Sequence, residues 1–219
     1  MRIGTWNMDV KSSTGSTELL LAQDCDVLLL TEVPAAWSLE GYTVTPAGES
    51  MLPDGKQWAA VASRRPLRPC FVPHGASTGA VIDGVTYVCS VLPWAGSGGD
   101  YPWDGDDHPS RVAATLEALR PFLAEQADLV WGGDWNHALH GPERAGSSLG
   151  RADLLRLLVD LRLGVATSEL AHALPGLRSI DHVAARPPAQ RAERVVAELG
   201  HRRLSDHDLY VVDLDVRTS

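Results

Sequence analysis

The chain contains little lysine, little cysteine and no long hydrophobic run. Lys11 and Lys56 are the only lysines, and the net charge is −9 over 219 residues. No broad basic surface is therefore available to hold a polyanion by counterion release alone. The three cysteines, Cys25, Cys70 and Cys89, are odd in number and lack CxxC spacing. Neither a zinc finger nor a disulfide framework is indicated.

Membrane and export signals are also missing. No apolar run approaches the roughly 18 residues that a membrane span requires. Met1 leads directly into the strand-like IGTWN, without the basic and apolar regions of a signal peptide. We therefore expect a cytoplasmic protein with no membrane partner, and no obligate protein partner is indicated. Hydrophobic residues make up 44% and charged residues 21%, which is enough for a packed core. With no repeat and no linker, we expect a single domain over residues 1–219.

Strands and helices alternate along the chain. The strand-like runs are Ile3–Asn7, Asp26–Thr31, Gln57–Ala62, Val85–Leu92, Asp128–Gly132, Ser179–Ala184 and Leu209–Val216. Helical spacing of leucines predicts helices over Ser16–Gln23, Ser110–Gln126 with a kink at Pro121, and Arg151–Leu163. Loops are expected over 95–110 and 140–150, and an exposed connection over 184–194. This mixture predicts an α/β or α+β fold with stacked sheets.

Polar residues follow several of these strands at the point where each strand ends. The motifs are TWNMD, LLLTE, GGDWN, SIDHV and SDH, which contain Asn7, Asp9, Glu32, Asp134, Asn136, Asp181, Asp206 and His207. A carboxylate next to a buried strand is costly unless it is paired or binds a metal. A set of separate turns and helix caps is the alternative explanation. So many such residues at one kind of position favour a shared site, and hard oxygen ligands suit Mg²⁺ or Mn²⁺.

The five motifs in this order resemble the endonuclease/exonuclease/phosphatase superfamily, the fold of DNase I and of exonuclease III-type abasic endonucleases. The resemblance runs from residue 3 to about 215. It implies a four-layer sandwich of two packed mixed β-sheets flanked by helices, and a hydrolase acting on phosphate esters with Mg²⁺ or Mn²⁺.

The resemblance also implies roles for the motif residues. Glu32 would be the principal metal ligand, with Asp9 and Asp206 near the same ion. Asn7 would orient these ligands or the phosphate. The catalytic groups would be Asp134, which orients or deprotonates the attacking water, Asn136, which bonds the phosphoryl oxygens, and His207, which binds the scissile phosphate and is held by Asp181. Hydrolysis of a phosphate ester needs this combination of in-line water and charge neutralisation.

The sequence departs from the family on the strand that reads TYVCSVLPWAG. Many members carry a phosphate-contacting His or Tyr there, whereas this chain has Ser90, Val91 and Leu92. Trp94, Tyr101 or His108 from the following loop are candidate replacements. We also expect Trp94 to stack on a substrate ring and Arg203 to contact substrate phosphates.

Three functions follow from the resemblance. The first is hydrolysis of phosphodiester bonds in nucleic acid, DNA or RNA. The second is a phosphatase or phosphodiesterase acting on a small molecule or a lipid head group, which the negative net charge favours. The third is a binding module with a dead catalytic site, which the missing His or Tyr favours.

Other polar clusters have simpler interpretations. Asp134, His137 and His140 have the spacing of zinc ligands, but no further ligand motif supports such a site, and we place both histidines in a substrate-side loop. The acidic stretch 104–108 lacks the terminal Glu of an EF-hand and is expected to be a solvated loop. His182 should point away from Asp181, because neighbouring side chains alternate along a strand.

Overall fold

A computed structural model describes residues 1–45 and 55–215 of the chain. The first six-stranded sheet has the strand order β11-β14-β1-β2-β4-β3. Its strands are β1 (Arg2–Asn7), β2 (Val27–Pro34), β3 (Thr43–Val44), β4 (Lys56–Ser63), β11 (Arg191–Val195) and β14 (Leu209–Asp213). β1 and β2 are parallel, and the other pairs in this sheet are antiparallel. The sheet is therefore mixed.

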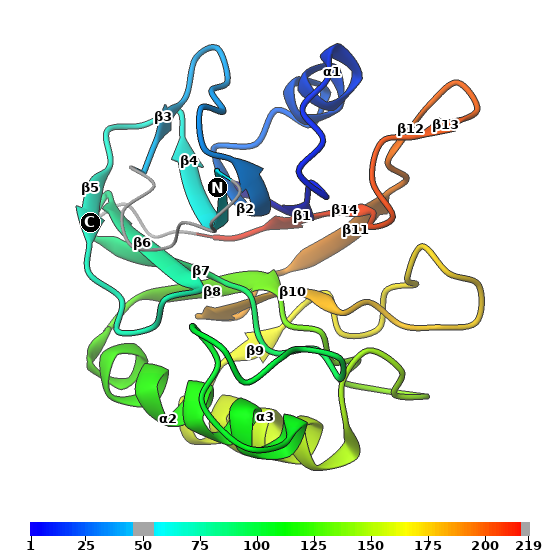
Figure 1. Ribbon diagram of the computed structural model, residues 1–219. Coiled ribbons are helices and arrows are strands. Elements are labelled where there is room, and N and C mark those ends of the chain that lie inside the picture. The colour runs from blue at the N-terminus through cyan, green and yellow to red at the C-terminus, as the bar shows by residue number, and fades with distance from the viewer. Residues whose placement is uncertain (46–54, 216–219) are drawn as a thin grey trace.

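The second six-stranded sheet has the order β5-β6-β7-β8-β10-β9. Its strands are β5 (Arg68–Cys70), β6 (Ser77–Ile82), β7 (Val85–Ser90), β8 (Leu129–Asp134), β9 (Gly164–Val165) and β10 (Asp181–Arg186). Only β7 and β8 are parallel. A separate two-stranded hairpin, β12 (Glu198–Leu199) with β13 (Arg202–Arg203), projects from the body of the molecule (Figure 1).

Helices cover the two outer faces of the stacked sheets, which gives the expected four layers (Figure 1). α1 (Thr14–Ala22) lies on the first sheet, and α2 (His108–Glu125) and α3 (Ser148–Asp160) lie on the second. α1 and α2 connect the parallel strand pairs, because parallel neighbours need a crossover. No helix among the described residues is long and apolar enough to cross a membrane.

The packing of β2 explains why its sequence is continuously apolar and does not alternate. Leu29 packs between the two sheets, in a cluster with Tyr87 and Val130. Leu28 and Leu30 point the other way and pack with Leu20 of α1. Both faces of the strand are therefore covered, as its apolar run predicts.

A further apolar cluster packs α2 and α3 against the second sheet. Leu116 and Leu119 of α2 and Leu154 of α3 pack in one cluster with Trp131 of β8. α2 begins with a capping box, in which the Asp107 side chain accepts from the backbone N–H of Ser110, and continues past Pro121 to Glu125.

The predicted fold and the expected helices and strands are confirmed, with boundary shifts of a few residues. Val216, the expected end of the last strand, lies outside the described residues. One prediction is wrong: the stretch 184–194 is not simply an exposed connection. β10 continues to Arg186, and β11 begins at Arg191 and pairs with β14, which extends the first sheet. The proline- and arginine-rich composition concealed a strand at the sheet edge, where arginine is tolerated because one side faces solvent.

Candidate active site

Side chains from both sheets meet at one edge of the sandwich. Asn7 ends β1 and Glu32 lies in β2, while Asp134 ends β8 and Asp181 begins β10. His207 precedes β14. Asp181 and Asp134 are direct partners in the antiparallel register of β10 and β8. The strand order therefore brings together residues that are up to 200 positions apart in the sequence.

Asn7 connects the two sheets through its side-chain amide. Its Nδ2 donates to Glu32 Oε1 at 3.0 Å and to Asp134 Oδ2 at 2.9 Å, and its Oδ1 accepts from the backbone N–H of Asp9 at 2.9 Å. The side chain is buried. Both amide protons and the amide oxygen are used, so Asn7 fixes the separation of the Glu32 and Asp134 carboxylates.

His207 is bound between two buried carboxylates. Its Nδ1 lies 2.7 Å from Asp181 Oδ2, and its Nε2 lies 3.9 Å from Asp134 Oδ2. Burial lowers the pKa of His207, but the charges of Asp181 and Asp134 outweigh burial and raise the pKa to about 10. The imidazole is therefore protonated at neutral pH, and it presents Nε2–H as a donor toward the site.

The ligand atoms of Asp134, Asp181 and His207 lie within 4.8 Å of one another, which is a spacing that can hold a metal ion. A protonated imidazole has no lone pair to give to a metal. This cluster therefore fits a hydrogen-bonded acid–base group better than an ion site, and Glu32 is the carboxylate left for a cation.

The backbone at the site is strained. Asp9, Val10, Glu32 and Asn136 have φ values of 47°, 54°, 50° and 53°, and they are four of the seven such non-glycine residues in the described ranges. Each costs on the order of 1–3 kcal/mol and persists because surrounding contacts fix it. Here the backbone N–H groups of Met8 and Val10 donate to the carbonyls of Thr31 and Glu32, at 2.9 Å each.

Glu32 has the surroundings that a cation ligand requires. Its Oε1 accepts the neutral amide of Asn7, and no described arginine, lysine or histidine forms an ion pair with its carboxylate. Burial raises the pKa of Glu32, and the Asn7 hydrogen bond partly opposes this. A carboxylate that is mostly desolvated and without a positive partner fits a hard divalent cation.

A model of the Endonuclease/Exonuclease/phosphatase family matches residues 4–207 of the sequence. The chain belongs to this family. Its members are hydrolases that act on phosphoester bonds. No curated protein sequence matches the chain significantly.

Solved structures of the family share the fold. An AP endonuclease from Archaeoglobus fulgidus superposes with a TM-score of 0.74 at 17% identity, covering 99% of this chain and 100% of that one. A 3′ phosphatase from Neisseria, bound to a product DNA hairpin, gives 0.71 at 19% identity, with 99% and 100% coverage. An endonuclease/exonuclease/phosphatase protein from Beutenbergia cavernae gives 0.61 at 15% identity, with 97% and 70% coverage.

The remaining predicted metal ligands of this endonuclease/exonuclease/phosphatase protein lie farther out. Asp9 forms an ion pair with Lys11. The Asp206 side chain is 78% exposed, and its Oδ1 lies 4.0 Å from His207 Nε2. The charge of Asp9 contributes to the raised pKa of Glu32, and the roles of Asp9 and Asp206 at an ion stay predictions.

Asn136 is held beside Asp134, and its predicted role at the phosphate stays a prediction. Its backbone N–H donates to Asp134 Oδ1 at 3.1 Å, and its Nδ2 donates to the carbonyl of Leu92 at 3.0 Å. One amide proton is used by Leu92, and the other is left for a substrate oxygen.

The two predicted substrate contacts have different surroundings. Trp94 is 37% exposed, with its ring centroid 6.2 Å from Trp58 and 6.1 Å from Trp103. Arg203 donates from Nη1 to the buried Asp208 at 2.6 Å. Trp94 therefore offers a ring face to solvent, whereas the Arg203 guanidinium already has a carboxylate partner.

The candidate replacements for the missing family His or Tyr also differ in their surroundings. Ser90 accepts from Ser77 and from Trp131 Nε1 within the second sheet. Tyr101 is 70% exposed. His108 is not in a solvated loop as expected, because it is the first residue of α2, is buried, and bonds Pro93 and Ser147. His108 is therefore enclosed by these contacts.

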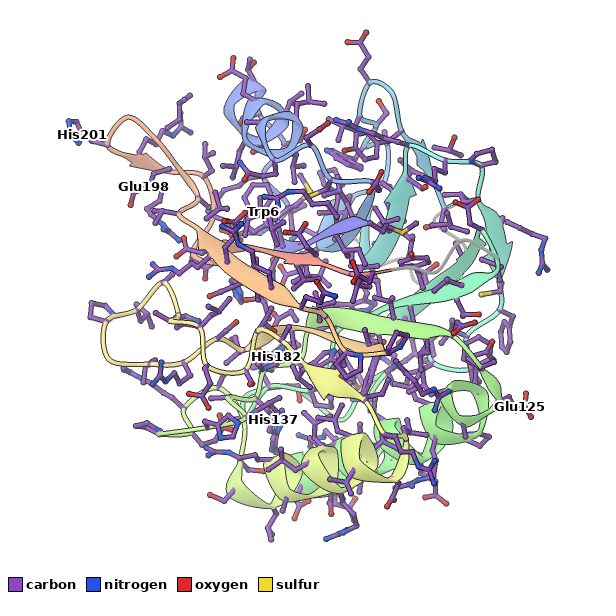
Figure 2. All side chains as sticks on the ribbon, turned by 180° about the vertical axis from the view of Figure 1, so that it is seen from behind. Trp6, Glu125, His137, His182, Glu198 and His201 are labelled. Atoms are coloured by element: carbon purple, nitrogen blue, oxygen red, sulfur yellow. The ribbon has the colours of Figure 1, made fainter. Side chains whose placement is uncertain are left out.

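Two histidine predictions have different outcomes. His182 points away from Asp181 as expected, and its Nε2 lies 2.9 Å from the carbonyl of His137 (Figure 2). His137 lies in the loop after β8 as expected, but its side chain is buried and stacks on His108 instead of facing solvent. Gly146 and Gly150 lie so close that a Cβ on either would be 2.5 or 2.6 Å from its ring, and this packing encloses it.

Sequence reasoning missed several residues that build the site. Ser205 donates its hydroxyl to the carbonyl of Asn7 at 2.7 Å and accepts from the backbone N–H of His207 at 3.1 Å. Asp208 is fully buried and binds two arginines. Ser205 and Asp208 both belong to the run SDHD, which contains the predicted residues Asp206 and His207. This adjacency in the sequence was the signal that could have identified them. Arg144 and His172, which line the hollow beside His207, gave no signal in the sequence.

Proposed function

We propose that the protein is a metal-dependent phosphodiesterase that hydrolyses nucleic acid. The observation that carries this proposal is the continuous chain of hydrogen bonds and close charges from Asp181 through His207 and Asp134 to Asn7 and Glu32. It contains a protonated donor, a buried carboxylate and a second carboxylate without a positive partner. These are the groups that in-line hydrolysis of a phosphate ester uses.

Asp134 is suited to receive a proton from the attacking water. Burial raises its pKa to about 6, so the carboxylate is ionised at pH 7 but remains a usable base. Asn7 and the backbone of Asn136 hold its two oxygens in place. The position of the attacking water is then set by a carboxylate that cannot rotate.

His207 and Asn136 would bind the phosphate. The Nε2–H of His207 carries positive charge and would donate to a phosphoryl oxygen whose negative charge grows in the transition state. Asp181 keeps the ring oriented and charged through Nδ1. Glu32, with Asp9 and Asp206 as further carboxylates, would hold Mg²⁺ or Mn²⁺, which supplies charge neutralisation at the phosphoryl and leaving oxygens.

The substrate class rests on two observations. Trp94, which follows two residues after the Leu92 that bonds Asn136, is 37% exposed and would offer a ring face to a base. The family neighbours include an AP endonuclease and a 3′ phosphatase bound to a DNA hairpin. The net charge of −9 is unfavourable for DNA at a distance, but a bound cation reverses the local field.

The test is hydrolysis of a single-stranded and a double-stranded DNA oligonucleotide beside p-nitrophenyl phosphate, with Mg²⁺ or Mn²⁺. We expect metal-dependent cleavage of DNA, lost by at least about a hundredfold in Asp134→Asn and His207→Ala, the range seen when an acid–base group is removed. His201→Ala is the matched control, because His201 lies on the projecting hairpin (Figure 2). Wild-type rates in both site variants would refute the assignment, and hydrolysis of the monoester alone would make the protein a phosphatase.

A further inference from the structure

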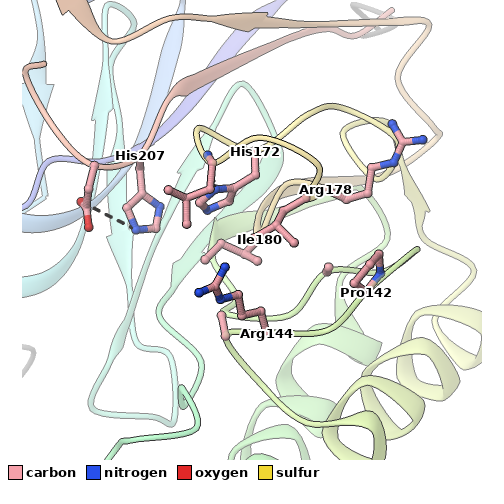
Figure 3. Close-up of a pocket in the computed structure, with 11 residues that line it drawn as sticks. Pro142, Arg144, His172, Arg178, Ile180 and His207 are labelled. Carbon is pink, nitrogen blue, oxygen red and sulfur yellow. Dashed lines mark hydrogen bonds and ion pairs between the residues drawn. The ribbon is translucent and has the colours of Figure 1, made fainter.

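A hollow of about 290 Å³ opens directly beside His207. Ile180 and Leu177 form part of its apolar wall, and Arg144, Arg178 and His172 bring polar groups to it (Figure 3). The volume is near the lower end of small-ligand sites, which measure roughly 300–1,000 Å³. It can hold one unit of a larger substrate next to the reacting group.

The two arginines in this hollow differ in whether their charge is already used. Arg178 donates to the carbonyl of Glu169, and its Nη2 lies 3.7 Å from Glu169 Oε2. The Arg144 guanidinium forms no hydrogen bond or ion pair with any residue in the described ranges. Figure 3 shows it extending into the space beside His172. A cation without a carboxylate partner in an acidic protein is available to an external anion.

The loop that carries Arg144 is fixed by its neighbours. Glu143 Oε1 accepts the backbone N–H groups of Arg144 at 2.9 Å and Gly146 at 3.1 Å, and Glu143 Oε2 accepts from Arg151 Nε at 3.2 Å. The carbonyl of Ala145 accepts from the backbone N–H of Ala95 at 2.7 Å. The loop is therefore held by groups other than the Arg144 side chain, which lowers the entropy cost of binding a ligand there.

His172 adds a second donor. Its Nδ1 accepts the backbone N–H of Leu174 at 2.9 Å, so the proton of the neutral ring is on Nε2. No described residue bonds this Nε2, although the residue is only 9% exposed and its ring centroid lies 5.9 Å from that of His207. Because His172 lines the hollow, this unpartnered Nε2–H is available to an acceptor on a ligand that enters it.

We propose that Arg144 and His172 form an anion subsite that binds the phosphodiester flanking the scissile one in a nucleic-acid strand. The inference rests on the proposed function, since it places a second phosphate of the same substrate. The sugar between the two phosphates would lie against the apolar wall of Ile180 and Leu177. Asp206 lines the same hollow next to His207, so the second phosphate belongs at the Arg144 end, away from that carboxylate.

The experiment uses thymidine trinucleotides in which one linkage is a neutral methylphosphonate, which resists hydrolysis. Cleavage of the remaining phosphodiester is compared with cleavage of the same bond in the all-phosphodiester trimer. We expect neutralising one flanking position to lower wild-type kcat/KM about tenfold, the lower end for a hydrogen bond between charged groups because Arg144 is exposed. In Arg144→Ala this ratio should approach one, and Arg144→Lys should restore part of it.

Arg68→Ala is the matched control, because Arg68 is an exposed arginine of β5, and it should keep the wild-type ratio. A general effect of Arg144→Ala on folding would slow both substrates and leave the ratio unchanged. A wild-type enzyme that is indifferent to the flanking charge, or an Arg144→Ala variant that keeps the full ratio, would overturn the subsite alone. No cleavage of any trimer or longer strand would overturn the proposed function with it.

Discussion

Replacement of Asp208 should cost a large part of the stability of the protein. Its side chain is fully buried beside His207. It accepts the backbone N–H of Ala197 at 3.0 Å and Nη1 of Arg203 at 2.6 Å, and it forms an ion pair with Arg194. Asp208→Asn keeps the shape of the side chain but presents an NH₂ group to two guanidinium groups.

The expected loss can be worked from these contacts. A hydrogen bond to a charged group contributes about 1.5–3 kcal/mol. The side chains of Arg194 and Arg203 are 29% and 34% exposed, so water recovers part of each contribution. We expect Asp208→Asn to lower the free energy of unfolding by about 3 kcal/mol, near the lower end for breaking a buried pair.

The assay is urea unfolding followed by tryptophan fluorescence, fitted as a two-state transition. Asp160→Asn is the matched control: Asp160 pairs with Arg120 at 2.7 Å, but both side chains are more than 40% exposed. That substitution should cost less than about 1 kcal/mol. Equal losses in the two variants would refute the reasoning, since it depends on burial and not on the ion pair as such.

Three further outcomes are expected. Gly133→Ala should lower the free energy of unfolding, measured in urea, by about 3 kcal/mol or more, because its Cβ would lie 2.2 Å from the carbonyl oxygen of Ser90. The control Gly84→Ala should lower it by only about 1 kcal/mol, because no atom lies within 4 Å of its Cβ. Burial lowers the pKa of His182 and His74 to about 4, so each should contribute a loss of stability of up to about 1.4 kcal/mol per pH unit as pH falls from about 6.5 toward 4. Unfolding measured across this range with the same slope in the wild type and in His74→Gln would contradict it. Mg²⁺ should raise the melting temperature of the wild type, and Glu32→Gln should remove most of the increase. If calorimetry shows that Mg²⁺ raises the melting temperature of the wild type and of Glu32→Gln equally, the ion binds elsewhere.

Strand β11, at the edge of the first sheet, shows where local sequence signals fail. The run RAERV of β11 has three charged residues among five, two of them adjacent, and follows two prolines. Its strand conformation depends on pairing with β14, which lies more than ten residues further along the chain. A pairing partner that is absent from the local window leaves no pattern in it.

The histidines show the same limit for the site. His137 and His140 are three residues apart, yet one is enclosed under α3 and the other is exposed beside Glu169. Arg144 and Arg178 line the same hollow, yet of these two only Arg178 has a carboxylate partner among the described residues, Glu169. Such differences are set by which distant segment packs nearby, and residue type and spacing do not carry them.

The order of polar residues after buried strands indicated a shared site and carried the family resemblance, which in turn implied the layered fold and the set of Asn7, Glu32, Asp134, Asp181 and His207. Strand-end carboxylates are costly, so their repeated occurrence is a local signal of a shared site. The tertiary structure alone decided how these groups pair: Asn7 connects the two sheets, Asp181 keeps His207 charged, and the Arg144 guanidinium and the His172 Nε2 have no partner among the described residues. The reason is that charge and hydrogen-bond state depend on distances between segments, which only the folded chain sets.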